Sequence, residues 1–286
     1  MAPTMRRTAL LASASVLVVG MIGWPVAHRA DAAPAAFVHP GVTVSQAQLD
    51  FARAKVNAGA QPWKGAFDQM PASKYADLNR TPKPRATVEC GSYSNPDHGC
   101  TDERQDAIAA YTDALAWYIT RDDRYARKSI QLMDAWSGVI KEHTDSNAPL
   151  QTGWAGSSWP KAAEIIKYTY TGSWPNSDRF ATMLRDVYLP EVANGSRTNG
   201  NWELSMTEAA VGISVFLGDR TSYDNAMARF RTRAAAYVYL SSDGDLPKTV
   251  PSQHLDTRAN GCARRSGSRP GTSWAPPSRA GCAAAR

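Results

Sequence analysis

Cysteine is scarce in this sequence, and no two cysteines have the spacing of a zinc-binding pair. The 286 residues include four Cys and five His, and no C-x-x-C pair occurs, so we expect neither a metal site nor a metal cofactor. The sequence also lacks a run that alternates between apolar and polar residues as half-buried strands do. It therefore predicts a fold built mainly from helices.

An excess of positive charge is also missing from the middle of the chain, although the formal net charge of the whole sequence is +6. Residues 1–33 contribute three Arg and one Asp, and residues 259–286 contribute five Arg and no acidic residue. Residues 34–258 hold 24 Lys and Arg against 25 Asp and Glu. Because nucleic-acid binding depends on basic side chains that neutralise phosphates, this balance excludes nucleic acid as the expected partner.

Residues 1–33 have the three parts of an export signal. Arg6 and Arg7 form a charged region, an apolar stretch runs from Ala9 to Val26, and Ala30-Asp31-Ala32 supplies small residues for cleavage. The alternative, a membrane anchor, is disfavoured by the Ala, Ser and Gly content of the apolar stretch. We therefore expect a secreted protein, extracellular or periplasmic, with no membrane segment after cleavage.

The four cysteines fall into two pairs. Cys90 and Cys100 flank the turn-rich segment GSYSNPDHG, and exported proteins form disulfides, so we expect a bridge between them. Cys262 and Cys282 lie in residues 259–286, where Ala, Gly, Arg, Ser and Pro occupy 23 of 28 positions. Such a segment cannot bury apolar surface. We expect either a disordered tail or the product of a reading-frame change near residue 258, which leaves 34–258 as the folded domain.

Helical patterns dominate the predicted domain. A capping box at Ser45 and Gln48 precedes one apolar-periodic segment, and two joints, ITRDDRYARKSI and FLGDRTSYDNAM, each connect two helical segments through a short turn. This repetition favours antiparallel helix pairs around a common axis. Further helices are predicted over 102–119, 125–140, 160–170, 178–189 and 202–217, and irregular rim segments over 78–100, 141–157 and 190–201.

Residues 150–166, LQTGWAGSSWPKAAEII, carry side chains suited to binding a sugar. Trp154 and Trp159 flank a Gly/Ser-rich segment that reads as a turn, and Lys161 follows it. Indole rings stack on the apolar faces of sugars, and Lys161 is suited to pairing with an acidic sugar. Each tryptophan fits the protein core equally well, so both interpretations stay open.

Two further segments carry candidate polar groups. In SRTNGNWELSMTEAA, Asn199 and Asn201 precede the helix that begins at Trp202. One asparagine is explained as a helix cap, and the other amide is a candidate donor to a substrate carboxyl group. In PSQHLDTR, His254 lies in a proline-bounded loop near Arg258; it is either a catalytic or a surface histidine.

Together with HPGVTVSQAQLDFARAKVNAGAQPWKGAFDQM and VECGSYSNPDHGCTDER, these segments resemble secreted bacterial polysaccharide lyases of the alginate lyase superfamily. The resemblance covers about residues 39–258. It implies an all-α fold, an (α/α) toroid or incomplete barrel of antiparallel helical hairpins. It also implies cleavage of uronic-acid polymers, such as alginate or glucuronan, by β-elimination without a cofactor. The expected partner is an acidic polysaccharide, and we expect a monomer.

β-Elimination requires neutralisation of the uronate carboxylate, a base for the C5 proton and an acid for the departing O4 oxygen. The resemblance implies that Asn, His, Arg and Tyr side chains do this work. Asn201, with Asn199 as second candidate, fits the amide, and His254 fits the imidazole. The family's Arg and Tyr are expected downstream, and residues 259–286 do not supply them. The expected substrate-binding residues are Trp154, Trp159, Lys161, Trp202, Glu203 and Arg258.

Two other functions are compatible with the sequence. One is a catalytically inactive relative that binds acidic polysaccharide through Trp154, Trp159 and Lys161. The other is an (α/α) glycoside hydrolase that pairs the Glu203 carboxylate with Asp243 or Asp245. The nature of the products distinguishes them, because only a lyase leaves unsaturated chain ends.

Overall fold

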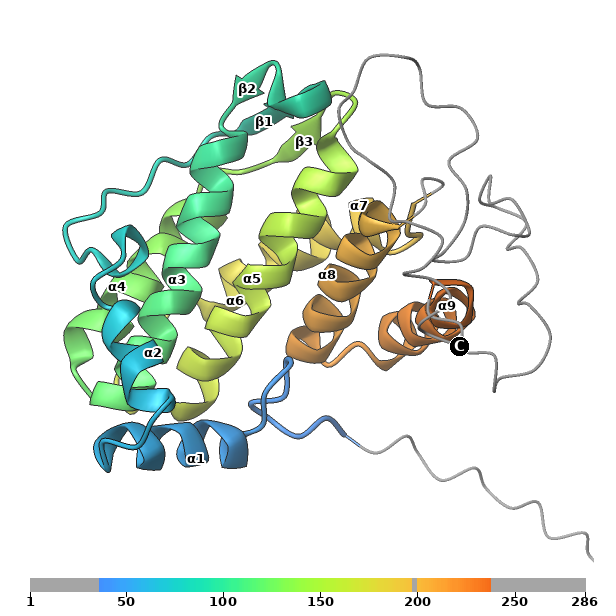
Figure 1. Cartoon of the computed structure of the whole chain (residues 1–286). Helices are drawn as coiled ribbons and strands as arrows, with labels where there is room; N and C mark the ends of the chain where they lie inside the picture. Colours follow the sequence, from blue (N-terminus) through green and yellow to red (C-terminus); the bar gives the residue numbers. More distant parts are fainter. Residues whose placement is uncertain (1–35, 197–199, 238–286) are drawn as a thin grey trace, which may run out of the picture. The chain divides into compact units, whose positions relative to one another are not determined.

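The computed structural model describes residues 36–196 and 200–237 of the chain. The predicted export signal and the predicted tail, 259–286, lie outside the described residues. Most of the described residues are helical (Figure 1), which confirms the all-α class. The elements are α1 (Gln46–Asn57), α2 (Trp63–Gln69), η1 (Lys74–Ala76), β1 (Thr87–Cys90), η2 (Ser92–Ser94), β2 (Asp97–His98), α3 (Cys100–Thr120), α4 (Asp123–Ser137), β3 (Glu142–Thr144), α5 (Ala148–Thr169), α6 (Ser177–Met183), η3 (Leu184–Tyr188), α7 (Leu189–Val192), α8 (Asn201–Leu217) and α9 (Arg220–Tyr237).

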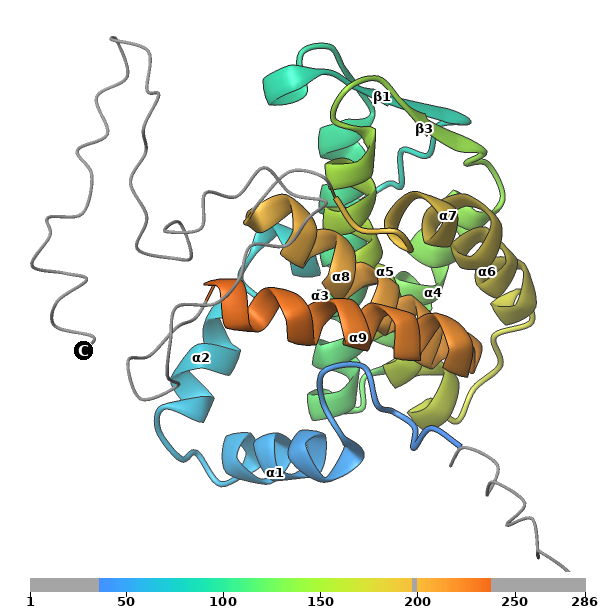
Figure 2. The same ribbon diagram turned by 90° about the vertical axis from the view of Figure 1, so that its right-hand side faces the viewer.

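Three long helices, α3, α5 and α8, run side by side in the same direction (Figures 1 and 2). The chain returns between them through α4 and then through α6 to α7, and α9 follows α8 as a further return helix. Both predicted joints therefore connect antiparallel helix pairs, α3 with α4 and α8 with α9. The closure of these pairs into a toroid stays a prediction.

The start of α1 confirms the predicted capping box. The Ser45 hydroxyl accepts from the Gln48 amide at 3.3 Å, while the Gln48 side chain accepts from the Ser45 amide at 2.9 Å. These bonds satisfy two backbone donors that a helix start otherwise leaves unpaired. Local sequence therefore fixes this helix boundary.

The helix predicted to begin at Pro160 begins twelve residues earlier, at Ala148. The Gly/Ser-rich segment that reads as a turn is helical because its glycines permit close packing against α8. A Cβ atom on Gly153 would lie 3.2 Å from the Met206 amide nitrogen, and one on Gly156 would lie 3.3 Å from the Ala209 Cβ. Tertiary packing thus overrides the local preference for a turn, and it corrects the predicted irregular segment 141–157 from residue 148 onward.

Two other features differ from the prediction. Pro190 does not end a helix but lies in the first turn of α7, where the missing amide hydrogen costs nothing.

The rim segments also contain short strands that the sequence pattern does not reveal. β1 pairs antiparallel with β2 and parallel with β3, and the resulting sheet lies at the end of the molecule where α3 and α5 begin (Figure 1).

The predicted bridge between Cys90 and Cys100 is confirmed, with a Cα–Cα distance of 5.9 Å. It links the end of β1 to the first residue of α3. Among the described residues, none of the helices combines the length and apolar character needed to cross a membrane.

The side chain of Asp113 is buried in α3, and neither of its carboxylate oxygens has a hydrogen-bond partner among the described residues. Burial raises the pKa of Asp113 to about 8, although the charges of Lys128 and Arg80 act to lower it. The carboxyl group therefore stays protonated in the folded protein over a wide pH range.

Asp113→Asn should abolish one component of the pH dependence of stability. Because the pKa in the folded state lies above the ordinary value of 3.8, folding takes up a proton between these two pH values. The contribution of Asp113 to stability is complete below pH ~4 and is lost as the pH rises to about 8. The Tm of the variant relative to the parent should rise over this range, by about 2–4 °C for each kcal/mol.

Thermal unfolding followed by circular dichroism at pH 4, 6 and 8 measures this difference. Asp186→Asn, which changes an exposed carboxylate in η3, is the matched control. A Tm difference for Asp113→Asn that is as flat as that of the control contradicts the prediction.

Candidate active site

The parallel helices α3, α5 and α8 present partly exposed side chains on a common surface, which we call the open helix face. Contacts between helices establish it: Arg104 of α3 meets Trp154 of α5, and Lys161 of α5 meets both Tyr111 of α3 and Glu208 of α8. Ile108 lies one turn from Arg104 on α3, and Leu204 lies one turn from Glu208 on α8. The open helix face therefore comprises Arg104, Ile108, Tyr111, Trp154, Lys161, Leu204 and Glu208.

A cation and an indole lie together at the end of this face nearest the sheet. Trp154 is 36% exposed, and the Arg104 guanidinium carbon lies 5.2 Å from its ring centroid. Such a cation–π contact holds both groups while leaving the ring partly accessible. The arrangement suits a ligand that has both an apolar ring face and a negative charge.

A second cation lies farther along α5. Lys161 Nζ is 2.7 Å from Glu208 Oε1 and 5.8 Å from the centroid of the Tyr111 ring. Burial raises the pKa of the Tyr111 phenol, the nearby Glu208 charge raises it further, and a hydrogen bond with Thr43 opposes them. The open helix face thus has two cations and one carboxylate, a balance that favours an anionic ligand.

Arg104 is held from below by a buried amide. Gln151 Nε2 donates to the Cys100 carbonyl at 2.9 Å and to Glu103 Oε2 at 2.5 Å. These two acceptors fix the orientation of the amide, so that Gln151 Oε1 points to the Arg104 guanidinium and accepts from it at 2.5 Å. The buried amide therefore sets the position of a surface cation.

Beneath the amide lies the buried carboxylate of Glu103. It accepts from the Tyr188 hydroxyl at 2.5 Å and lies 2.8 Å from His143 Nε2. Burial, followed by the charge of Glu103, raises the pKa of Tyr188 well above its ordinary value. Tyr188 therefore stays protonated and donates to the carboxylate rather than acting as a solvent-facing acid.

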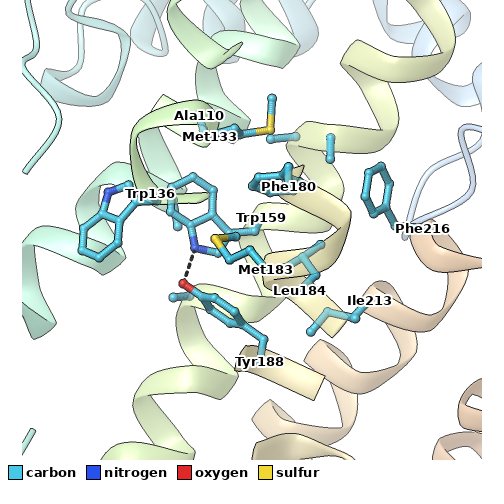
Figure 3. Close-up of a cluster of buried hydrophobic side chains, with 14 of the residues drawn as sticks. Ala110, Met133, Trp136, Trp159, Phe180, Met183, Leu184, Tyr188, Ile213 and Phe216 are labelled. Carbon is cyan, nitrogen blue, oxygen red and sulfur yellow. Dashed lines mark hydrogen bonds between the residues drawn. The ribbon is translucent and has the colours of Figure 1, made fainter. Parts of the chain in front are cut away.

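The structure corrects the assignment of Trp159 as a sugar-stacking residue. Its ring is fully buried among Trp136, Phe180 and Tyr188 (Figure 3), and its Nε1 donates to the Tyr188 hydroxyl at 3.1 Å. No ring face is open to a ligand. Trp154 lies five residues earlier, a helical offset that places it on the opposite, exposed side of α5.

Glu203 is also buried, which corrects its assignment as a substrate-binding residue. Its Oε2 accepts from the Ser196 amide at 2.5 Å, and its Oε1 lies 3.5 Å from Arg233 Nε and 3.8 Å from Arg229 Nε. The carboxylate therefore joins the segment before α8 to α9 and does not reach the open helix face.

The remaining predicted site residues divide between α8 and the undescribed parts of the chain. Asn201 is the exposed first residue of α8, and Trp202 beside it is half-buried. Asn199, His254 and Arg258 lie outside the described residues. No group of three or more potential metal ligands occurs in the ranges 36–196 and 200–237.

The sequence of the chain also matches a known protein family. The family model described as alginate lyase matches residues 47–250, which is more than half of the sequence. The chain belongs to the alginate lyase family. A search of curated proteins finds no match to it. Membership makes it a polysaccharide lyase by family, and a polysaccharide its implied substrate.

In this alginate lyase family member, the sequence pattern does not reveal the partners of Trp154 and Lys161. Arg104 of α3 contacts the Trp154 ring, and Glu208 of α8 pairs with Lys161. The Gln151 amide in turn accepts from Arg104. Each of these contacts joins two helices that are far apart in the sequence. The only local signal was helical periodicity, which places Arg104, Ile108 and Tyr111 along one side of α3.

The two tryptophans of α5 should respond differently to substitution. Trp159→Ala removes a fully buried ring and should lower the free energy of unfolding by about 3–5 kcal/mol. Trp154→Ala removes a partly exposed ring and should cost less than half as much while weakening binding of polysaccharide. Urea unfolding and affinity electrophoresis in alginate measure the two effects. Equal losses of stability would contradict the placement of the rings.

Proposed function

We propose that this protein cleaves uronic-acid polymers by β-elimination on the open helix face. The observation that carries the proposal is the exposed Trp154 ring with the Arg104 guanidinium 5.2 Å from its centroid, on the same face as Lys161. A uronate chain offers apolar ring faces for the indole and one carboxylate per sugar for the cations. Family membership supports the same reaction class.

Neutralising the substrate carboxylate is the chemical task that limits β-elimination. The C5 proton becomes acidic only when donors stabilise the negative charge that spreads onto the carboxylate as the proton leaves. We assign Asn201, exposed at the start of α8, as the amide donor, with Asn199 as second candidate. His254 supplies the imidazole, as a second donor or as the base for the C5 proton. Trp154, Lys161 and Trp202 contact the polymer, with Arg258 as a further candidate.

The carboxylates of the described residues favour elimination over hydrolysis. A glycoside hydrolase needs two carboxyl groups facing each other across the sugar, about 5–9.5 Å apart. The open helix face has one, Glu208, and it is paired with Lys161 at 2.7 Å. Glu203, the other candidate, is buried against two arginines. The proposal includes export of the chain, residues 34–258 as the folded domain, and action as a monomer without a cofactor.

Asn201→Ala and His254→Ala should each lower kcat by about 10²–10³-fold, the usual cost of removing one donor to a developing oxyanion. The Tm should change little, because Asn201 is exposed. The assay follows the ultraviolet absorbance of unsaturated uronate ends released from alginate and from glucuronan. Asn57→Ala, at the exposed end of α1, is the matched control.

Turnover close to that of the parent in both variants would overturn the assignment of these two residues. A parent protein that binds the polymers but releases neither unsaturated nor reducing ends would instead be an inactive polysaccharide binder. Reducing ends without ultraviolet absorbance would identify a hydrolase.

Lys161 and Glu208 should change substrate binding in opposite directions. Lys161→Gln removes a cation from the open helix face and should raise KM about tenfold, equivalent to ~1.4 kcal/mol. Glu208→Gln removes the carboxylate that pairs with Lys161 and should lower KM. Both effects should shrink at high salt, because screening weakens exposed charges. Initial rates at two ionic strengths test this, and changes of KM in the same direction for both variants would contradict it.

A further inference from the structure

A second pair of an indole and a cation lies on the first two helices. Lys55 Nζ of α1 is 5.3 Å from the centroid of the Trp63 ring of α2, and it is also 5.3 Å from the centroid of the Phe51 ring. The two rings meet edge to face, with their centroids 5.7 Å apart. We call these three side chains the α1–α2 cluster. It repeats the chemistry of Arg104 and Trp154 with different residues.

The rings of the α1–α2 cluster are open to solvent. Phe51 is 52% exposed, and Trp63 is 36% exposed, the same fraction as Trp154 on the open helix face. Other side chains of α1, Leu49 and Val56, are buried, and none of the side chains of α2 is buried. Both rings therefore lie on the surface, where a ligand can stack on them.

The positive charge of Lys55 is available as well. Lys55 forms no ion pair within the part of the chain that the structure describes. The nearby carboxylate of Asp50 accepts from the Tyr118 hydroxyl at 2.6 Å. That of Asp68 pairs with Lys64 at 2.5 Å. The α1–α2 cluster thus combines apolar ring faces with a cation that these carboxylates do not neutralise.

The α1–α2 cluster lies far from the cation of the open helix face. The bond from Tyr118 to Asp50 joins α1 to the end of α3, whereas Arg104 lies near the start of α3. Tyr118 follows Arg104 by 14 residues in this helix, which is about 21 Å along its axis. Figure 1 accordingly shows α1 at the end of the molecule opposite the sheet. One sugar therefore cannot contact both places.

We propose that the α1–α2 cluster is a second binding site, which holds a distant part of a uronic-acid polymer without cleaving it. Each uronate unit presents an apolar ring face to Phe51 and Trp63 and a carboxylate to Lys55. A polymer that is already bound at the open helix face makes this second contact within the same complex, which raises its affinity. The choice of a uronate polymer rests on the proposed function. The site itself rests on the exposed rings and on the cation between them.

Affinity electrophoresis of the full chain in gels that contain alginate or glucuronan tests the proposal. Lys55→Gln keeps both rings and should bind the polymer about tenfold more weakly than the parent. Arg127→Gln, which removes an exposed cation from α4, is the matched control and should bind like the parent. Trp63→Leu should weaken binding by a similar factor, whereas Trp63→Phe keeps an aromatic ring and should retain most of it.

Short substrates distinguish a distant site from the active site. Lys55→Gln should leave kcat and KM for a uronate trisaccharide unchanged, because the α1–α2 cluster lies far from the open helix face. A rise of KM for the trisaccharide as large as the loss of polymer binding overturns the proposal, since it would place Lys55 among the residues that bind the cleaved sugars.

Three other results would overturn the second site. The first is a parent that does not bind the polymers, and the second is binding like that of the parent by both Lys55→Gln and Trp63→Leu. The third is an equal loss of binding to polyglutamate in Lys55→Gln, which would show an effect of charge without recognition of a sugar.

The outcome is separable from the lyase reaction. A parent that binds polymer through the α1–α2 cluster but releases no unsaturated ends overturns only the proposed function. Unsaturated ends released by a parent whose Lys55 and Trp63 variants bind as well as it does overturn only the second site.

Discussion

The buried carboxylate of Glu103 is the constraint around which one end of the molecule is arranged. A charge removed from water is tolerated only where hydrogen bonds replace its hydration. Here the partners come from three other elements: His143 from β3, Gln151 from α5 and Tyr188 from η3. Satisfying one carboxylate on α3 therefore fixes the sheet, the start of α5 and the return segment η3 relative to one another.

The side chain of Gln151 connects the buried Glu103 carboxylate to the surface. Gln151 can direct its amide hydrogens only toward the two acceptors below it, and its oxygen is then left to bind Arg104. Arg104 in turn lies against Trp154. A buried hydrogen-bond network of this kind positions an exposed cation more firmly than surface contacts alone. A long side chain held only by surface contacts loses little free energy when it moves to another conformation.

Glu203 has a similar structural role at the start of α8. It too is a buried carboxylate in the first turn of a long helix, and it binds a backbone amide of the preceding segment and two arginines of α9. Asn201 lies two residues before it. The same side chain thus anchors the segment that presents the proposed amide donor and joins it to α9.

Sequence alone predicts the helical class, the capped start of α1, the helix pairs at both Asp-Arg joints, the Cys90–Cys100 bridge and the family. Each depends on residues close together in the chain or on motifs read as a whole. It does not show which of Trp154 and Trp159 is exposed. The predictions of a turn at Gly153 and Gly156 and of a surface role for Glu203 are wrong. Those points were decided by the tertiary structure, because the packing of α5 against α8 and the burial of the Glu203 carboxylate against α9 depend on partners from other elements.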